Sequence, residues 1–204
     1  MSESDLQFDF SFEAICFSTN YENCNSIQIL KQYFMSTKCS DINYNNTNNV
    51  TFKHTLNVGT NNIHIECSNN YVEMSPSSKN IKIKDETDCF IIFFDLEYND
   101  SLSELYKIFK MASDLGIGDK KFYLICIYTD VKNKNEDKYE NEIKEYLGNF
   151  LINNYDISKV NMETDELAKK IDKITIECLQ DKSLLNSDLK DLDNDKSKSM
   201  CIIS

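Results

Sequence analysis

Hydrophobic residues along this chain gather in short runs, and two of these runs are apolar at consecutive positions. Residues 88–95 contain Cys-Phe-Ile-Ile-Phe-Phe, and residues 122–128 read Phe-Tyr-Leu-Ile-Cys-Ile-Tyr. Strands that are apolar on both faces are typical of the centre of a parallel sheet that is covered on both sides. Two further runs flank Gly59-Thr-Asn-Asn62, which is typical of a hairpin turn. The other predicted strands are residues 8–17, 50–58, 62–67 and 150–152.

Between the predicted strands, apolar residues recur at the spacing of a helix. At the most regular of these segments, Ser101 and Glu104 fit a capping box, and Gly116 fits a helix stop. Strands that alternate with helices predict an α/β fold with a doubly wound, mostly parallel sheet and right-handed crossovers. The predicted helices are residues 25–35, 101–115, 136–147 and 164–179, the last with an apolar stripe at Leu167, Ile171, Ile174 and Cys178.

The hydrophobic pattern predicts one domain over residues 8–180, between a flexible N-terminus (1–7) and a flexible tail (181–204). Hydrophobic residues are 41% of the 204, which is enough for a core. The tail is rich in Ser, Asp, Lys and Asn, a composition typical of a disordered tether. The longest apolar runs are too short to span a bilayer, and the first residues are too polar for a signal peptide.

Charge and cysteine usage exclude several classes of function. The formal charge of −12 argues against a nucleic-acid partner, because phosphate contact needs clustered Lys and Arg. The eight Cys occur singly with no C-x-x-C pair, so zinc-site spacing is absent and a reducing, cytoplasmic compartment is expected. His54 and His64 lie on neighbouring predicted strands, but two ligands are too few for a metal site, and none is expected.

The last four residues, Cys201-Ile-Ile-Ser204, fit the C-a-a-X rule for prenylation, and the final Ser favours a farnesyl group. They predict that a prenyltransferase modifies Cys201 and that the protein lies on the cytosolic face of a membrane. The tail carries more Asp than Lys and has no second Cys nearby, so one lipid would hold the protein weakly and reversibly. The alternative is an unmodified, frayed end.

Three stretches of the chain carry a resemblance to a known family. An apolar strand ends in Asp95 and is followed by a helix that opens with Ser101; a second strand runs on to Asp130; Ser158 and Lys159 precede the last helix. In this order they resemble the Ras superfamily of small GTPases, nearest to its Rab and Ras branches. The resemblance implies a P-loop-NTPase-like small GTPase fold, with a mostly parallel six-stranded sheet, one antiparallel hairpin strand and helices on both faces.

The phosphate-binding motifs of that family are degraded here. The loop G-x-x-x-x-G-K-[ST] needs glycines for close approach of the backbone and a Lys against the phosphate charge. The matching segment, Ser18 to Ser26, has no Gly, places Asn25 where the Lys belongs and adds Glu22. Ser26 alone fits, at the position that would bind Mg²⁺. The D-x-x-G motif falls on residues 69–72, Asn-Asn-Tyr-Val, and has neither key residue.

The guanine side of the family's site is partly kept. Asp130 matches the last residue of N-K-x-D, but Ile127 and Tyr128 replace its Asn and Lys. Ser158 and Lys159 keep part of the S-A-K loop. Glu73 falls near the water-orienting Gln, and Thr47 is a counterpart of the Thr in the first switch. Purely structural roles remain as alternatives: Asp130 could be a turn residue at a strand end, and Ser26 a residue in the first turn of a helix.

These observations lead to a pseudo-GTPase as the expected function: no catalytic residues, no cofactor, and action through unidentified effector proteins, plausibly in vesicle trafficking or signalling. Phosphate and Mg²⁺ contacts carry most of the catalysis in this class, and they are the part that is missing. The alternative is a divergent small GTPase that still binds GTP or GDP with Mg²⁺ through Ser26, Asp130, Ser158 and Lys159 and hydrolyses GTP. A third reading is a nucleotide-independent adaptor with an incidental C-terminus.

Overall fold

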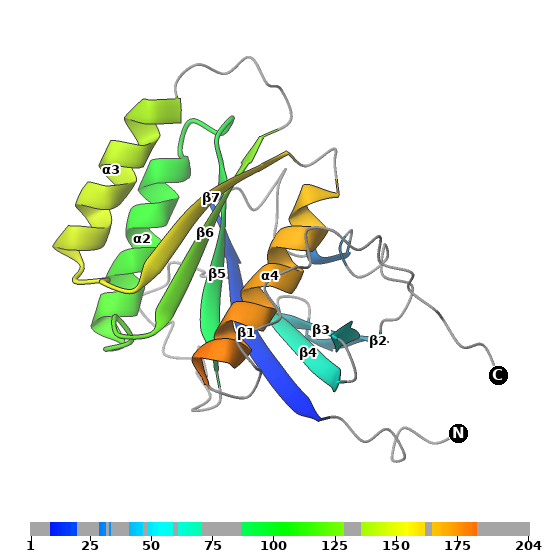
Figure 1. The fold of residues 1–204 in the computed structure, drawn as a ribbon. Coiled ribbons are helices and arrows are strands. Elements are labelled where there is room, and N and C mark those ends of the chain that lie inside the picture. The colour runs from blue at the N-terminus through cyan, green and yellow to red at the C-terminus, as the bar shows by residue number, and fades with distance from the viewer. Residues whose placement is uncertain are drawn as a thin grey trace.

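The computed structural model describes residues 9–19, 29–31, 33, 41–46, 49–58, 61–70, 87–128, 136–161 and 165–182. Its strands form one seven-stranded sheet in the order β2-β3-β4-β1-β5-β6-β7 (Figure 1). Among these strands, β3 alone runs opposite to the rest, because it pairs antiparallel with both β2 and β4. The strands are β1 (Phe10–Ser18), β2 (Asp41–Asn46), β3 (Asn49–Val58), β4 (Asn61–Asn70), β5 (Cys89–Asp95), β6 (Lys121–Tyr128) and β7 (Tyr155–Asn161).

Helices cover both faces of the sheet. On one face lie α2 (Ser101–Asp114) and α3 (Glu136–Asn149), and on the other lies α4 (Glu166–Asp181) together with the helical residues 29–31 and 33 (Figure 1). None of the described helices is long and apolar enough to cross a bilayer.

The central strands separate two hydrophobic clusters because their side chains alternate between the faces. In β5, Cys89, Ile91 and Phe93 join the cluster under α4, whereas Phe90, Ile92 and Phe94 join the cluster under α2 and α3. Both sets are fully buried, which explains why this strand reads as a continuous apolar run. On the α2 and α3 side, the Phe17, Phe90 and Phe122 rings stack across three strands, with centroids 6.3 Å and 5.0 Å apart. The predicted stripe on the last helix is also buried, at Leu167, Ile171, Ile174 and Cys178.

The predicted α/β class, the mostly parallel sheet and the single antiparallel strand are confirmed. The predicted number of six strands is wrong, since β2 adds a seventh at the edge next to β3. Its sequence, Asp-Ile-Asn-Tyr-Asn-Asn, has one aliphatic residue and overlaps the Asn-rich stretch. An edge strand needs little hydrophobicity, because it has a single strand neighbour to pair with.

The prediction of a strand at residues 150–152 is also wrong. These residues form the turn that ends α3, where the Ile152 N–H bonds the Leu147 carbonyl at 2.9 Å and Leu151 has a φ of 56°. This is a Schellman-type helix end, in which the left-handed residue is ordinarily a glycine. The last strand is β7 instead, five residues further along the chain than the predicted start.

Candidate functional site

The sheet topology indicates where a ligand would bind. In open α/β sheets, ligands lie outside the carboxyl ends of the strands, at the point where the strand order reverses. Here β2, β3 and β4 lie on one side of β1, and β5, β6 and β7 lie on the other. The switch point therefore lies at the carboxyl ends of β1 and β5, which is also where the family resemblance places the phosphate loop.

A buried threonine closes the end of β1. The Thr19 N–H donates to the Phe93 carbonyl at 3.0 Å, and its Oγ1 accepts the Asp95 N–H at 3.1 Å. The same hydroxyl donates to Ser101 Oγ at 3.0 Å. Ser101, the first residue of α2, donates in turn to the Asp95 carbonyl at 2.5 Å. Thr19 and Ser101 are each 1% exposed. Their side chains therefore form a buried hydrogen-bond cluster that joins β1, β5 and α2.

The position of Thr19 conflicts with phosphate binding. Counted back from Ser26, the motif G-x-x-x-x-G-K-[ST] places its first Gly at residue 19. That Gly is needed because the phosphate loop must turn tightly with its backbone N–H groups open to the ligand. Here the residue carries a buried side chain, and its N–H is bonded to Phe93.

Carboxylates surround the same edge of the sheet. Asp95 ends β5, and its Oδ1 accepts the Glu97 N–H at 2.8 Å. Asp100 precedes the first turn of α2, which also carries Glu104. A helix N-terminus attracts anions through its free N–H groups and its dipole. Asp95, Glu97 and Asp100 near this helix N-terminus oppose that attraction, whereas Glu104 is paired with Lys107 at 2.7 Å.

The end of β6 carries Ile127 and Tyr128 at the first two positions of the guanine motif. Ile127 is 1% exposed and belongs to the cluster under α4, and its carbonyl accepts the Leu96 N–H at 3.0 Å. Tyr128 packs against the cluster under α2 and α3. Ile127 is therefore part of the core and the half-buried Tyr128 lies at its edge, in place of the Asn and Lys of N-K-x-D.

The prediction that Ser158 and Lys159 lie in a loop is wrong, because both lie within β7, opposite Ile125 and Cys126 of β6. Consecutive strand residues point to opposite faces. Lys159 lies on the α3 side, where it adds to the stronger effect of Lys144 in lowering the pKa of Glu140. Ser158 Oγ is buried and has no hydrogen-bond partner among the described residues. The two side chains therefore do not converge on one ligand.

The other predicted site residues, Ser26, Asp130 and Cys201, lie outside the described residues, as do Thr47 and the segment 71–73. The structure therefore leaves their roles as predictions. Of the first metal and phosphate motif, it describes the first position, Thr19, and of the D-x-x-G segment it describes Asn69 and Asn70, which end β4.

The two histidines do not share a face of the sheet. The His54 position pairs with Ile65, and His64 pairs with Thr55, so the two positions are one residue out of register and belong to opposite faces. Across the described ranges, no three His, Cys, Asp or Glu side chains come together as a metal site.

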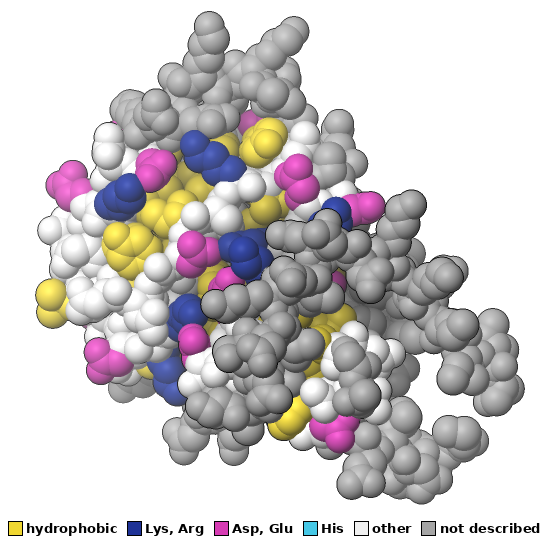
Figure 2. Space-filling view, viewed as in Figure 1, with side chains coloured by type: hydrophobic (Ala, Val, Ile, Leu, Met, Phe, Trp, Pro, Cys, Tyr) yellow, Lys and Arg dark blue, Asp and Glu magenta, His cyan; other side chains and the backbone are white. Residues whose placement is uncertain are grey.

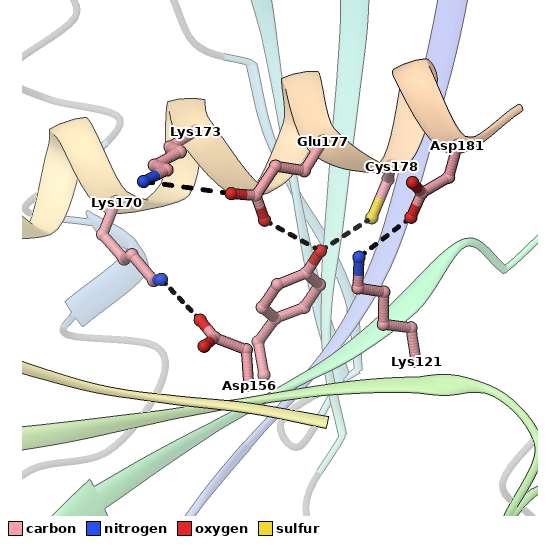
Figure 3. A network of polar contacts seen from close by, with 8 residues as sticks. Lys121, Asp156, Lys170, Lys173, Glu177, Cys178 and Asp181 are labelled. Atoms are coloured by element: carbon pink, nitrogen blue, oxygen red, sulfur yellow. Dashed lines mark hydrogen bonds and ion pairs between the residues drawn. The ribbon is translucent and has the colours of Figure 1, made fainter. Parts of the chain in front are cut away.

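A polar network that the sequence analysis missed lies between α4 and strands β6 and β7 (Figure 3). Tyr123 OH lies 3.3 Å from Glu177 Oε2 and 3.6 Å from Cys178 Sγ. Figure 2 shows that Lys side chains and Asp or Glu side chains are interspersed over this face. The residues that pair in this network are up to 60 positions apart in sequence. In the sequence, the charged residues of α4 were the signal that could have indicated it. The ion pairs are Lys170–Asp156 at 2.7 Å, Lys121–Asp181 at 2.9 Å and Lys173–Glu177 at 4.0 Å.

This network fastens α4 to the sheet. A further ion pair joins Lys182, just after α4, to Asp88, whose carboxylate is buried and also accepts the Glu13 N–H at 2.9 Å. Exposed ion pairs contribute little individually, but a carboxylate held by both a cation and a backbone N–H is a stronger constraint. The network is therefore structural at both ends of the helix.

Comparison of the chain with models of known protein families and with curated proteins found no match.

Proposed function

We propose that this protein is a pseudo-GTPase: a small-GTPase-like α/β domain that does not hydrolyse GTP and acts by binding partner proteins. The α/β sheet with one antiparallel strand and helices on both faces supports the domain type. A helical segment after β1 and another after β5 fit the same arrangement.

The buried hydrogen-bond cluster of Thr19, Asp95 and Ser101 is the observation that carries the proposal. At the position where a phosphate loop would have to begin, the buried Thr19 and Ser101 side chains bond to each other and to the backbone of Asp95. The acidic edge of α2 adds electrostatic repulsion against a triphosphate. Phosphoryl transfer in this class depends on positioning and on charge stabilisation by a Lys and Mg²⁺, so loss of the cradle removes the main catalytic contributions.

The runner-up is a divergent GTPase, and the matches at Asp130 and Ser26 favour it. Nucleotide content separates the two. The purified protein is denatured, and the supernatant is analysed for guanine nucleotides by ion-exchange chromatography. We expect no stoichiometric GDP or GTP. One nucleotide per protein would overturn the proposal in favour of the runner-up.

The role in vesicle trafficking or membrane signalling rests on the family resemblance alone. We propose that a farnesyl group on Cys201 brings the domain to the cytosolic face of a membrane, where unidentified effectors add contacts. One lipid chain gives only marginal binding, and the mixed charges of the tail add little attraction to anionic lipid.

The anchor is tested with Cys201→Ser in the full chain. We expect the variant to move from the membrane fraction to the supernatant of lysed cells, because the thioether link cannot form. Cys126→Ser is the matched control, since it removes a buried core thiol and leaves the C-terminus intact. An unchanged distribution of Cys201→Ser would show that the tail does not anchor the protein and would favour the nucleotide-independent adaptor.

A further inference from the structure

The sheet has two outer edges, and these edges differ in regularity. Beyond β2 and β7, the described part of the chain places no further strand. The pairing of β2 is interrupted by a bulge between Tyr44 and Asn46, and bulges are one of the ways in which natural proteins protect an exposed edge. Strand β7 contains neither Gly nor Pro and pairs with β6 in an unbroken register over all seven of its residues. Its outer edge is therefore regular enough to pair with a further strand.

Alternate residues of β7 direct their backbone groups away from the sheet. The Asn154 carbonyl accepts the Phe122 N–H of β6 at 2.9 Å, so the even-numbered residues that follow Asn154 also bond β6. The odd-numbered residues direct their N–H and carbonyl groups outward. At the end of the strand, the outward N–H of Asn161 donates to a side-chain oxygen of the α4 residue Glu166 at 3.1 Å. The outward backbone groups of Tyr155 have no such partner among the described residues, and the same holds for the residue two positions further on.

The side chains along this edge are apolar or already paired near the middle of the strand. On the α3 side, Ile157 packs against the cluster under α2 and α3, and Tyr155 is 38% exposed. On the α4 side, the Asp156 carboxylate is paired with Lys170 at 2.7 Å. Figure 2 shows hydrophobic side chains along the region that β7 occupies in Figure 1, between Lys and Asp or Glu side chains. A free charge in the middle of the strand, which would discourage pairing, is therefore missing among these described side chains.

We propose that β7 pairs antiparallel with β7 of a second copy of this chain, so that the two sheets join across a twofold axis at Ile157. In this register the N–H and carbonyl groups of Ile157 bond those of Ile157 in the second copy. On the α3 side, Tyr155 lies opposite Lys159 of the second copy, and the ring can pack against the aliphatic part of the lysine. On the α4 side, Asp156 lies opposite Ser158 of the second copy, a neutral hydrogen-bond donor.

Other registers of the same pairing are less favourable. An axis at Asp156 would put two carboxylates directly opposite each other, and an axis at Lys159 would do the same with two ammonium groups. Like charges that lie directly opposite each other destabilise a strand pair. An axis at Ser158 would pair the first residue of the strand with Asn161, whose N–H is already bonded to α4. The axis at Ile157 avoids all three conflicts.

Charge favours a second copy over a strongly charged foreign strand. The edge carries one charge of each sign, Asp156 on the α4 side and Lys159 on the α3 side, so it offers no single-sign surface to an acidic or basic segment. The whole chain has a formal charge of −12, so two copies repel each other at long range. Salt screens that repulsion. A dimer through β7 should therefore tighten as the ionic strength rises, whereas a complex with a basic segment would weaken.

Sedimentation velocity tests the association, with the full chain at a series of concentrations, at low and high salt, and with a reductant. We expect a reversible monomer–dimer equilibrium that shifts toward the dimer as concentration and salt rise. Ile157→Glu and Ile157→Lys should each weaken the dimer by about tenfold or more, because like charges meet at the axis. Leu115→Glu is the matched control, since it adds a charge at a 43% exposed aliphatic position after α2, and it should leave the equilibrium unchanged. A chain that stays monomeric throughout would overturn the proposal and leave the edge to a strand of another protein.

Two further measurements test the register. An equimolar mixture of Ile157→Glu and Ile157→Lys should form mixed dimers, because unlike charges then meet at the axis, and this recovery also shows that both variants are folded. On oxidation, Ile157→Cys should give a disulfide-linked dimer above the background of the natural chain, since its two Cα atoms lie about 5.5 Å apart. Tyr155→Cys should not, because its two copies are displaced by about 14 Å along the strands. Undiminished dimers in both charged variants, or equal cross-linking of the two Cys variants, would place the contact elsewhere and overturn the assignment.

Discussion

At the scale of single residues, the end of β1 depends on one hydroxyl group. Thr19 Oγ1 is the acceptor for the Asp95 N–H and the donor to Ser101, in a place that water does not reach. A buried polar group that loses its partner costs more than the net contribution of the hydrogen bond, because its desolvation is no longer compensated.

Thr19→Val therefore should lower the free energy of unfolding by about 1 to 3 kcal/mol, since it keeps the side-chain shape but leaves the Asp95 N–H without a partner. Thr19→Ser keeps the hydroxyl and should cost less. Urea denaturation followed by circular dichroism gives both values. Equal stability of Thr19→Val and the natural chain would mean that the hydrogen-bond cluster at the end of β1 does not stabilise the folded protein.

Leu151 presents the opposite case, a residue that works against stability. It has a φ of 56° at the end of α3, and its side chain is 72% exposed. The left-handed conformation costs a residue with a Cβ about 1 kcal/mol or more, and glycine avoids that cost.

Leu151→Gly should raise the free energy of unfolding by about 1 kcal/mol, because little apolar contact is lost and the backbone strain is relieved. Leu151→Ala is the control: it removes the same exposed side chain but keeps the Cβ, so it should give no such gain. Thermal unfolding measures both. A lower melting temperature for Leu151→Gly would indicate that the leucine side chain has a contact that stabilises the turn.

At the scale of elements, strands that are buried on both faces could be predicted from the sequence. The edge strand and the side-chain contacts between distant residues could not. Strands β5 and β6 could be located because both of their faces are covered, which demands unbroken apolar runs. Strand β7, at the sheet edge, has Asp, Ser, Lys and Asn among its seven residues, so its Ser158 and Lys159 were mistaken for a loop. The helix-to-sheet network was also missed, because single-sequence periodicity says nothing about distant partners.

One such distant contact joins the helical segment after β1 to α4. Tyr33 OH donates to Asp172 Oδ1 at 2.6 Å across 139 residues of sequence. Burial raises the pKa of Tyr33 well above its usual value, and the Asp172 carboxylate raises it further. The unfolded chain ionises this phenol near pH 10, whereas the folded protein keeps it neutral. The stability it contributes is therefore complete below about pH 10 and is lost as the pH rises above that value.

Tyr33→Phe should lower the free energy of unfolding by about 1 to 2 kcal/mol at pH 7, because the hydrogen bond to a carboxylate is lost. It should also reduce the fall in stability between about pH 10 and 11, since one buried phenol no longer titrates. Tyr106→Phe, at a 45% exposed position, is the matched control for the loss of a tyrosine hydroxyl outside the core. Denaturant titrations at a series of pH values supply the comparison. A Tyr33→Phe curve that is parallel to the natural one would contradict the assignment.

At the scale of the whole molecule, the fold provides a place where a ligand would ordinarily bind, but the residues at that place are unsuited to a phosphate group. The α/β sheet provides a switch point at β1 and β5, where a ligand would ordinarily lie. The residues at that point are bonded to one another, the helix that begins there is flanked by carboxylates, and Ser158 and Lys159 point to opposite faces of β7. A domain built in this way is suited to present its surfaces to partners, and we propose that a lipid on Cys201 holds it where those partners are.

The most direct test of the pseudo-GTPase proposal is the affinity of the full chain for GTP and GDP, measured by isothermal titration calorimetry with and without Mg²⁺. A functional phosphate cradle would give tight, Mg²⁺-dependent binding, since the metal bridges the protein and the phosphates. We predict no saturable heat for either nucleotide in either condition at micromolar to millimolar concentrations. Saturable one-to-one binding that tightens with Mg²⁺ would contradict the proposal.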